Sequence, residues 1–222
     1  MLEAYDMVTK MIFPVLAAVA AIGAGTFFLV GKDKPEPQNI VANTAEAQIV
    51  GTEFSLLDHT GKRVTEKDYK GKYLLIYFGY TNCPEICPIN LASISDAMDK
   101  FGSLADEIIP LFVTIDPKRD SVEQIAEYIP MFSDRIIGLT GTPEELDQMA
   151  AGYRVFYEAY INKERGEGFV DFNHSSLTFL VGRDGKYLTH FPDGVEPETI
   201  VSTTKRMIKL LEPELLKPEL TN

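Results

Sequence analysis

Residues 73–88 read YLLIYFGYTNCPEICP, and this stretch decides the fold. Its first six residues form a continuous apolar run that ends at Gly79, which is typical of a central β-strand buried on both faces. The only two cysteines of the chain, Cys83 and Cys87, follow within a few residues. Residues 89–101 then carry apolar side chains near helical spacing. The stretch therefore predicts a strand and a helix with a cysteine pair between them.

Strands and helices alternate outward from this stretch. Apolar runs predict further strands, and spacing and capping signals predict further helices. The expected strands are 53–57, 63–64, 108–115, 136–139, 155–161, 177–181 and 187–191; the expected helices are 122–132, one that begins at Thr142-Pro143, and 196–211. We interpret residues 162–173 as a polar loop. This order predicts an α/β fold with a mixed central sheet and helices on both faces. A thioredoxin-like fold places a cysteine motif at the same point, after the first central strand.

The N-terminal part of the chain differs in composition from the rest. Residues 11–30, MIFPVLAAVAAIGAGTFFLV, contain no charge and are long enough to cross a bilayer as one helix. We interpret them as an uncleaved transmembrane anchor rather than a signal peptide, because the run is long and no basic cluster precedes it. Residues 1–10 form a short tail and 31–47 a polar linker with two prolines. Residues 48–222 are then one thioredoxin-like domain.

The overall composition excludes several classes of protein. The chain has 222 residues and a formal net charge of −12, so it repels phosphate backbones and nucleic acid is not an expected partner. With 45% hydrophobic residues it is too apolar for a disordered chain. The first arginine is Arg63, so an Arg-rich mitochondrial transit peptide is absent, which favours a bacterial membrane.

The spacing of the two cysteines suits either metal binding or redox chemistry. If the region opens a helix, Cys83 and Cys87 lie on one helical face near its N-terminus, where thiolates are stabilised. Two thiolates at this spacing can bind one soft metal ion, with Cu(I) preferred over hard cations. They are also close enough for a disulfide. An inert buried pair is the remaining alternative.

Three histidines are candidates for a third ligand. His59 falls in a predicted turn and His190 on a predicted strand, where a structural role is the simpler interpretation. His174 precedes the strand at 177–181, and in thioredoxin-like folds the loop that enters this strand faces the cysteine turn. A mixed set of two sulfur ligands and one nitrogen ligand suits Cu(I). We therefore expect His174 to approach the two thiols.

Several ordered motifs together resemble the Sco/SenC family of membrane-anchored copper proteins. They are FSLLD at 54–58, YFGYTNCPEICP at 77–88, TIDPKRD at 114–120, LTGTPEE at 139–145, YRVFY at 153–157 and GRDG at 182–185, with His174 before the last. The resemblance covers nearly all of residues 49–208. It implies a thioredoxin-like domain outside the cytoplasm that binds copper, with Cu(I) favoured, through Cys83, Cys87 and His174.

The resemblance also implies a biological role. Members assist assembly of the dinuclear copper centre, CuA, of cytochrome c oxidase. The expected partners are the CuA domain of subunit II and a copper donor protein, and the expected location is a bacterial inner membrane with the domain in the periplasm. On this interpretation the protein is a copper chaperone with no catalytic residue. The alternatives are a thiol–disulfide reductase that keeps the CuA-site cysteines reduced, and a redox or copper sensor.

Two details concern the surroundings of the expected site. The family commonly places Asp directly before the histidine, whereas here Asn173 occupies that position and Asp171 lies two residues further back. Either side chain is a candidate to orient the imidazole of His174. In the segment 116–120, DPKRD, we expect charge pairing and capping of the following helix.

Overall fold

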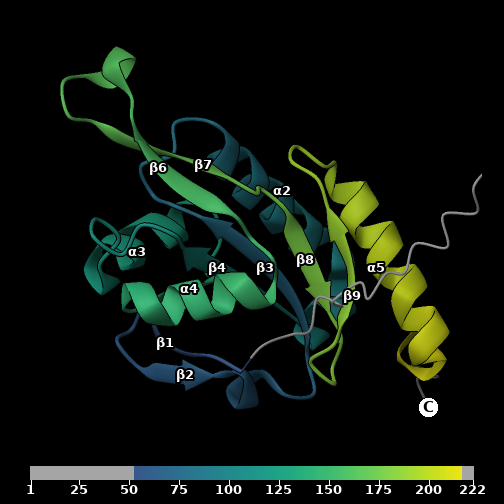
Figure 1. Ribbon diagram of the computed structural model, residues 1–222. Helices are drawn as coiled ribbons and strands as arrows, with labels where there is room; N and C mark the ends of the chain where they lie inside the picture. The colour runs from purple at the N-terminus through teal and green to yellow at the C-terminus, as the bar shows by residue number, and fades with distance from the viewer. Residues whose placement is uncertain (1–52, 217–222) are drawn as a thin grey trace, which may run out of the picture. The chain divides into compact units, whose positions relative to one another are not determined.

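The computed structural model describes residues 53–216 (Figure 1). The predicted tail, anchor and linker at 1–47 lie outside these residues. Within the described part of the chain, no helix combines the length and the apolar character needed to cross a membrane.

A seven-stranded mixed sheet forms the centre of the domain. Its strand order is β2-β1-β5-β4-β3-β8-β9. The pairs β3–β4 and β4–β5 are parallel, and the other pairs are antiparallel. The strands are β1 (Ser55–Asp58), β2 (Arg63–Thr65), β3 (Tyr73–Gly79), β4 (Ile108–Thr114), β5 (Ile137–Thr140), β8 (Thr178–Val181) and β9 (Tyr187–Phe191). The predicted mixed sheet is confirmed.

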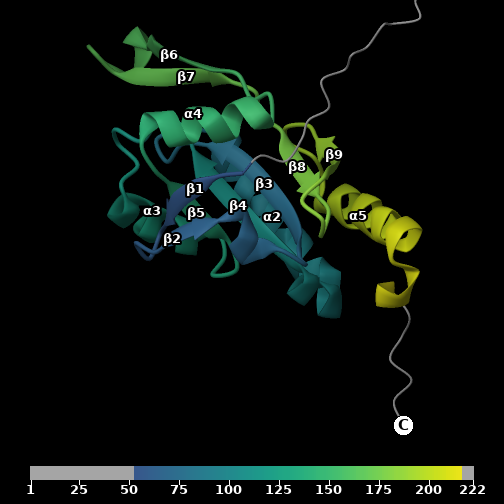
Figure 2. The same ribbon diagram turned by 60° about the horizontal axis from the view of Figure 1, so that its bottom comes forward.

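Helices cover both faces of this sheet. They are α2 (Ile86–Phe101), α3 (Val122–Tyr128), α4 (Pro143–Gly152) and α5 (Pro197–Leu211), with five short 3-10 helices: η1 (Glu66–Tyr69), η2 (Gly102–Glu107), η3 (Ile129–Met131), η4 (Lys163–Arg165) and η5 (Pro213–Leu216). Figure 2 shows α4 on one side of the sheet and α3 on the other. Neighbouring residues of β3 reflect these two layers: Tyr77 bonds to Asn90 of α2, whereas Phe78 packs against Tyr153 after α4.

The buried stripe of α2 ties the cysteine pair to the core. Cys87, Leu91, Ile94, Met98 and Phe101 recur at the spacing of one helical face, and all are buried. The apolar run of β3 is buried along its whole length, because the strand lies between β4 and β8 with a layer of helices on each face. Cys87 is therefore the first residue of a core-facing helical stripe.

The expected loop at 162–173 is wrong. Residues 163–165 form η4, and β7 (Val170–His174) pairs antiparallel with β6 (Tyr157–Ile161) in a separate two-stranded sheet. Apolar and polar residues do not alternate clearly in the outer part of this hairpin, and its tip carries charged residues. The sequence therefore lacks the apolar alternation that marks a half-buried strand. The hairpin projects beyond the main sheet (Figures 1 and 2).

Candidate functional site

The two cysteines lie where β3 leads into α2. Cys83 is in the connecting loop and Cys87 is in the first turn of the helix. The backbone N–H of Cys87 donates to Cys83 Sγ at 3.4 Å. Cys87 is fully buried and Cys83 is partly exposed, and both thiols are free. The expectation that both lie on one helical face needs correction: Cys83 precedes the helix, and its sulfur receives an N–H group of the helix N-terminus.

The pKa values of the two thiols shift in opposite directions because the Cys87 thiol donates a hydrogen bond to the Cys83 sulfur. The pKa of Cys83 is lowered to about 4, mainly by the hydrogen bond from the Cys87 thiol. Further bonds from His174 and from the backbone N–H groups of Cys87 and Glu85 act in the same direction. The same bond to Cys83, together with burial, strongly raises the pKa of Cys87. At neutral pH the pair is therefore a Cys83 thiolate beside a Cys87 thiol. Cys83 is the reactive sulfur of the two.

His174 lies at the end of β7 and reaches the cysteine loop from the hairpin. Its ring contacts Cys83 through the hydrogen bond that favours the thiolate. The ring also packs edge-on against Tyr80, with the centroids 6.0 Å apart, and its nitrogens lie 3.3 and 3.4 Å from Ser176 Oγ. The predicted approach of His174 to the thiols thus extends to Cys83, and the residue arrives on a strand rather than a loop.

The donor atoms at this junction fit a soft metal ion. Two sulfurs and an imidazole nitrogen are the ligand types that Cu(I) prefers, and the apolar surroundings of Cys87 favour an ion that needs few ligands. Across residues 53–216, however, no three His, Cys, Asp or Glu side chains are drawn together into a ready-made metal-binding cluster. The residues present supply the chemistry, with His174 in contact with one of the two sulfurs.

Asp171 holds the hairpin against the cysteine loop. Its buried carboxylate accepts from Arg165 Nη1 at 2.7 Å, from Asn162 Nδ2 at 2.7 Å and from the hydroxyl of Tyr80 at 3.4 Å. Arg165 also donates to the backbone carbonyl of Asn82 at 2.9 Å. Asp171 therefore acts on the site through Tyr80 and Arg165, since both donate to its carboxylate and both lie against the cysteine loop.

Asn173 lies on the exposed surface of β7. Adjacent strand residues point to opposite faces, so its side chain and that of His174 diverge. Its role beside the imidazole remains a prediction from the family pattern.

The structure adds Asp120 to the residues that shape the site. This fully buried carboxylate accepts from the Thr81 backbone N–H at 3.0 Å, from Thr81 Oγ1 at 2.6 Å and from Thr114 Oγ1 at 2.6 Å. Burial raises its pKa, against the lowering effect of these bonds. Asp120 thereby holds Thr81, two residues before Cys83. In the sequence, Asp120 stood out only as part of the segment 116–120, where we expected charge pairing. Within this segment the structure shows an ion pair between Asp116 and Arg119, and Asp120 is not part of it.

The other two histidines have separate roles. His59 Nδ1 accepts from the Gly138 backbone N–H at 3.0 Å, so the turn histidine ties β5 to the β1–β2 turn. The ring of His190 on β9 lies 2.6 Å from the Tyr187 hydroxyl through Nδ1. His59 lies in the predicted turn and His190 on the predicted strand.

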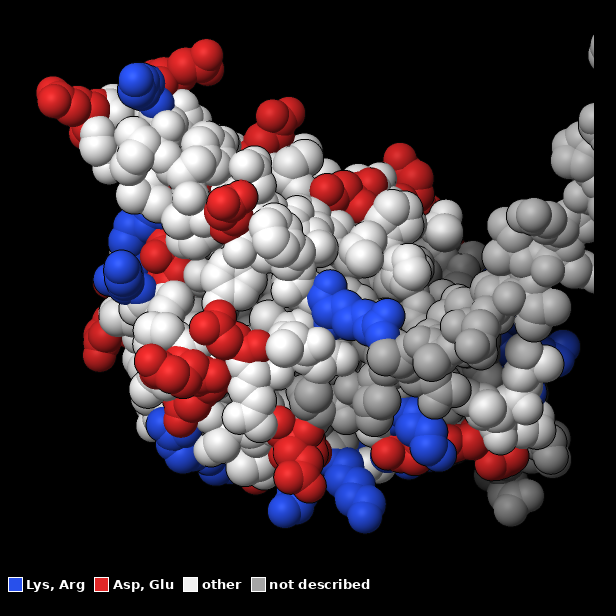
Figure 3. Space-filling view, viewed as in Figure 1, with Lys and Arg blue, Asp and Glu red and all other residues white. Residues whose placement is uncertain are grey.

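An apolar groove borders the cysteine loop. It has a volume of about 690 Å³ and lies between Asn82, the loop at 115–119, the start of α4 and the inner face of the hairpin. The guanidinium carbon of Arg119 lies 5.6 Å from the ring centroid of Phe169 and 6.0 Å from that of Phe172 in this groove. Figure 3 shows side chains of both charges at the projecting end of the hairpin.

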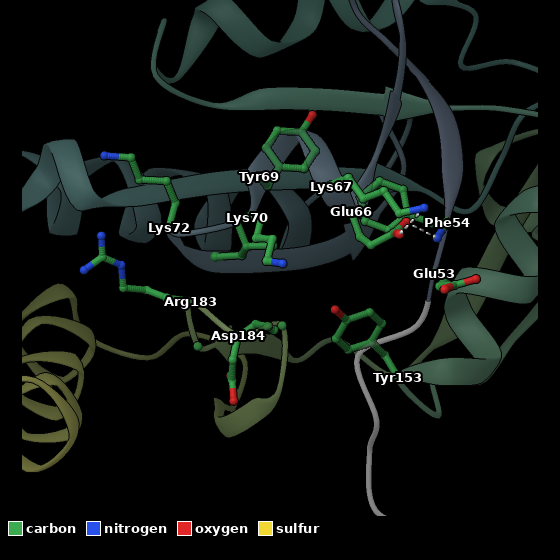
Figure 4. Close-up of a pocket in the computed structure, with 14 residues that line it drawn as sticks. Glu53, Phe54, Glu66, Lys67, Tyr69, Lys70, Lys72, Tyr153, Arg183 and Asp184 are labelled. Atoms are coloured by element: carbon green, nitrogen blue, oxygen red, sulfur yellow. Dashed lines mark hydrogen bonds and ion pairs between the residues drawn. The ribbon is translucent and has the colours of Figure 1, made fainter.

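A smaller pocket lies at the opposite end of β3. Figure 4 shows its lining, which includes Tyr69, Lys70, Lys72, Tyr153 and Arg183 around about 280 Å³. Seven residues of extended chain separate the two ends of β3, or about 20 Å. This pocket is therefore distinct from the cysteine site.

The fold and the site together define a thioredoxin-like thiol protein whose strand–helix junction carries soft metal donors. The family profile described as SCO1/SenC matches residues 42–209, and the chain belongs to this family. Its human relative, "Protein SCO1 homolog, mitochondrial", is 45% identical over 145 residues, which cover 64% of this chain and 48% of the relative. The match thus spans about half the length of that relative.

Two solved structures illustrate the likeness. The structure of Bradyrhizobium japonicum ScoI with copper bound has a TM-score of 0.65 and 36% identity, covering 71% of this chain and 98% of the other. The structure described as identifying a disulfide switch in BsSco, "a member of the Sco family of cytochrome c oxidase assembly proteins", has a TM-score of 0.56 and 27% identity, covering 72% and 94%. Relatives of this chain thus include a copper-bound protein and one with a disulfide switch.

Proposed function

We propose that this protein is a copper chaperone that assists assembly of the CuA centre of cytochrome c oxidase. The observation that carries the proposal is the Cys83–Cys87 thiol pair with His174 in contact with Cys83. Copper is the cargo, and the three side chains are its ligands. The copper-bound relative and the relative described as an oxidase assembly protein support the same assignment.

The chain's own residues explain how it could hold and release the ion. Cys83 is already a thiolate at neutral pH, whereas Cys87 must lose its proton when it becomes a ligand. Cys87 is locked in the core, while Cys83 is partly exposed and His174 comes from the projecting hairpin. An acceptor would therefore reach the ion from the side of Cys83 and His174. The CuA domain of subunit II and a copper donor protein are the proposed partners.

The proposed setting is a bacterial inner membrane. Residues 11–30 would anchor the chain by one helix, residues 31–47 would link it, and the domain would lie in the periplasm. The positive-inside rule offers little support, since Lys10 precedes the span and Lys32 and Lys34 follow it. Protease protection of the domain in sealed cells, lost when the outer membrane is opened, would test this topology.

A competition titration with a chromogenic Cu(I) chelator tests the copper site on the full chain in detergent. We expect one Cu(I) per chain. Alanine at Cys83, Cys87 or His174 should each weaken binding by more than about 100-fold, because losing a ligand costs more than losing a hydrogen bond that supports one. His190→Ala is the matched control and should bind as the parent chain does. Parent-like affinity of His174→Ala would remove His174 from the ligand set.

A thiol–disulfide reductase is the second candidate, favoured by the acidic Cys83 beside a protonated Cys87. Cys83 would attack a disulfide of the CuA site and release one substrate thiol. Cys87 would then lose its proton and attack Cys83, which releases the second thiol and leaves the chain as a disulfide. Cys87→Ser should trap the mixed disulfide with an oxidised CuA domain. If no mixed disulfide is trapped, the reductase function is overturned and the copper chaperone is the one proposed function that remains.

A further inference from the structure

Arg119 is anchored in the core of the domain and contacts the hairpin. It lies on the tight loop after β4, where its backbone N–H donates to the Asp116 carbonyl at 3.1 Å. Its Nε donates to the carboxylate of Asp116, whose side chain is only 5% exposed. The Asp116 backbone N–H in turn donates to Thr114 Oγ1 at 2.9 Å, at the end of β4. The central sheet thus fixes the direction of the guanidinium group.

Three aromatic rings lie around this guanidinium group. Its central carbon is 5.6 Å from the ring centroid of Phe169 and 6.0 Å from those of Phe172 and Tyr80. Nη2 is buried and has no hydrogen-bond partner among the residues that the structure describes. The negative faces of aromatic rings attract a cation in such a position. Stacking on rings is therefore what joins Arg119 to the hairpin.

A second guanidinium group contacts the ring of Phe169. The central carbon of Arg165 lies 4.1 Å from the centroid of that ring. Arg165 also donates to the Asn82 carbonyl at 2.9 Å, so it links the hairpin to the cysteine loop. Planar guanidinium groups stack on aromatic faces in a way that the compact ammonium group of lysine does not reproduce. The ring of Phe169 thus joins one arginine of the core to one arginine of the hairpin.

These ring contacts extend to His174 along one face of β7. Phe172 and His174 are two residues apart on this strand, so their side chains lie on the same face. Both rings contact Tyr80, with centroid distances of 5.1 Å from Phe172 and 6.0 Å from His174. Tyr80 and Phe172 each contact Arg119 as well. The position of the imidazole therefore depends on the same rings that the guanidinium group contacts.

We propose that Arg119 is a positioning residue for His174, and that it acts by stacking on aromatic rings of the hairpin and of the cysteine junction. The inference rests on the proposed function, because that function makes His174 a copper ligand. Asp116 then has the role of orienting the guanidinium group. The stack also explains how a hairpin whose strands pair only with each other keeps a defined position against the core.

The test compares three single variants of the full chain in detergent with the parent chain. Arg119→Met keeps an unbranched side chain and removes the guanidinium group. Arg119→Lys keeps the charge that pairs with Asp116 but lacks the planar group that stacks. Lys118→Met removes the adjacent, exposed cation and is the matched control. If stacking holds the hairpin, both Arg119 variants should disturb His174 and the control should not.

The first measurement follows the ring of His174 in the copper-free chain. The chain has three histidines, so NMR spectra of protein labelled with ¹³C-histidine contain three sets of ring signals, and the His174→Ala spectrum assigns one of them. The His174 signals report the edge-on contact with Tyr80. Arg119→Met and Arg119→Lys should both move them towards their values in the unfolded chain. The signals of His59 and His190 should stay in place, and Lys118→Met should move none of the three sets.

The second measurement is the Cu(I) affinity of the same variants by chelator competition. Arg119→Met should weaken binding by about 3- to 30-fold, which is the range for the loss of one or two cation–π contacts. Lys118→Met should bind Cu(I) as the parent chain does. If Arg119→Met does not fold, Phe169→Leu removes the stacked ring from the hairpin side and should give the same two results. Melting curves show which variants are folded.

The outcomes separate the two proposals. If the parent chain binds no Cu(I), the proposed function fails, and the His174 signals of the copper-free chain still decide whether Arg119 positions this ring. If the parent binds Cu(I) and Arg119→Met binds it equally well, the positioning role is overturned. Unmoved His174 signals in either Arg119 variant overturn it too. Movement of all three histidines would show a general structural role for Arg119 and would also overturn the proposal.

Discussion

The candidate site has two halves that are built differently. Cys87 belongs to the core: it begins the buried stripe of α2 and sits beneath the end of β3. His174 belongs to the β6–β7 hairpin, whose strands pair only with each other and whose β6 residues are largely exposed. Cys83 lies between them and contacts both. The comparison teaches that the packing of the whole domain positions one sulfur, whereas a few polar bonds and the aromatic contacts of Tyr80 position the imidazole.

Of the residues that support the core half of the site, Asp120 should contribute most to the free energy of unfolding. Asp120→Ala leaves the Thr81 backbone N–H and two threonine hydroxyls without their acceptor. We expect the free energy of unfolding to fall by about 2–4 kcal/mol, since buried unsatisfied donors are costly. Urea unfolding measures this. Asp134→Ala, at an exposed carboxylate, is the control and should stay within about 0.5 kcal/mol. A loss as small as the control's would mean that Asp120 does not hold the loop.

Asp171 should have a smaller effect that is confined to the hairpin half. Asp171→Ala removes the acceptor for Arg165, Asn162 and Tyr80. We expect a loss of about 1–3 kcal/mol, because Arg165 is partly exposed and can be solvated. Hydrogen exchange should speed up in β6 and β7 and stay slow in α2. Asn173→Ala, two residues along the same strand, is the control. Equal acceleration in α2 would show that the two halves are one cooperative unit.

The low pKa of Cys83 can be tested without any substitution, so this prediction involves the smallest change to the protein. With its pKa lowered to about 4, the folded and copper-free chain should be alkylated at a rate that is flat near neutral pH and falls as the pH drops through about 4. The unfolded chain has an ordinary thiol pKa near 8.5. The thiolate therefore contributes stability above that value, and the contribution is lost as the pH falls through the folded pKa. Mass spectrometry should find the label on Cys83 and not on Cys87. A midpoint near 8.5 in the folded chain would contradict the bonding described for Cys83.

The sequence predicted the core half better than the hairpin half. The run at 73–78 has a strong apolar signal, so the central strand, the following helix and the cysteine junction were all expected and are present. The segment 162–173 is polar, so β7 was missed, because a strand that projects from the main sheet lacks the alternation of a half-buried one. For the segment 116–120 we expected charge pairing and helix capping, since nothing local in these residues shows that the Asp120 carboxylate enters the core.

The sequence by itself determined the elements whose signals are local: the buried strands, the helix starts, the cysteine spacing and the family. Tertiary structure alone decided which groups meet across long distances in the chain. It brought Asp120 to Thr81, Asp171 to Tyr80 and Asn90 to Asp193, separated by 39, 91 and 103 positions. The physical reason is that polarity and periodicity act over a few residues, whereas a buried polar group takes whatever partner the packed fold brings within reach.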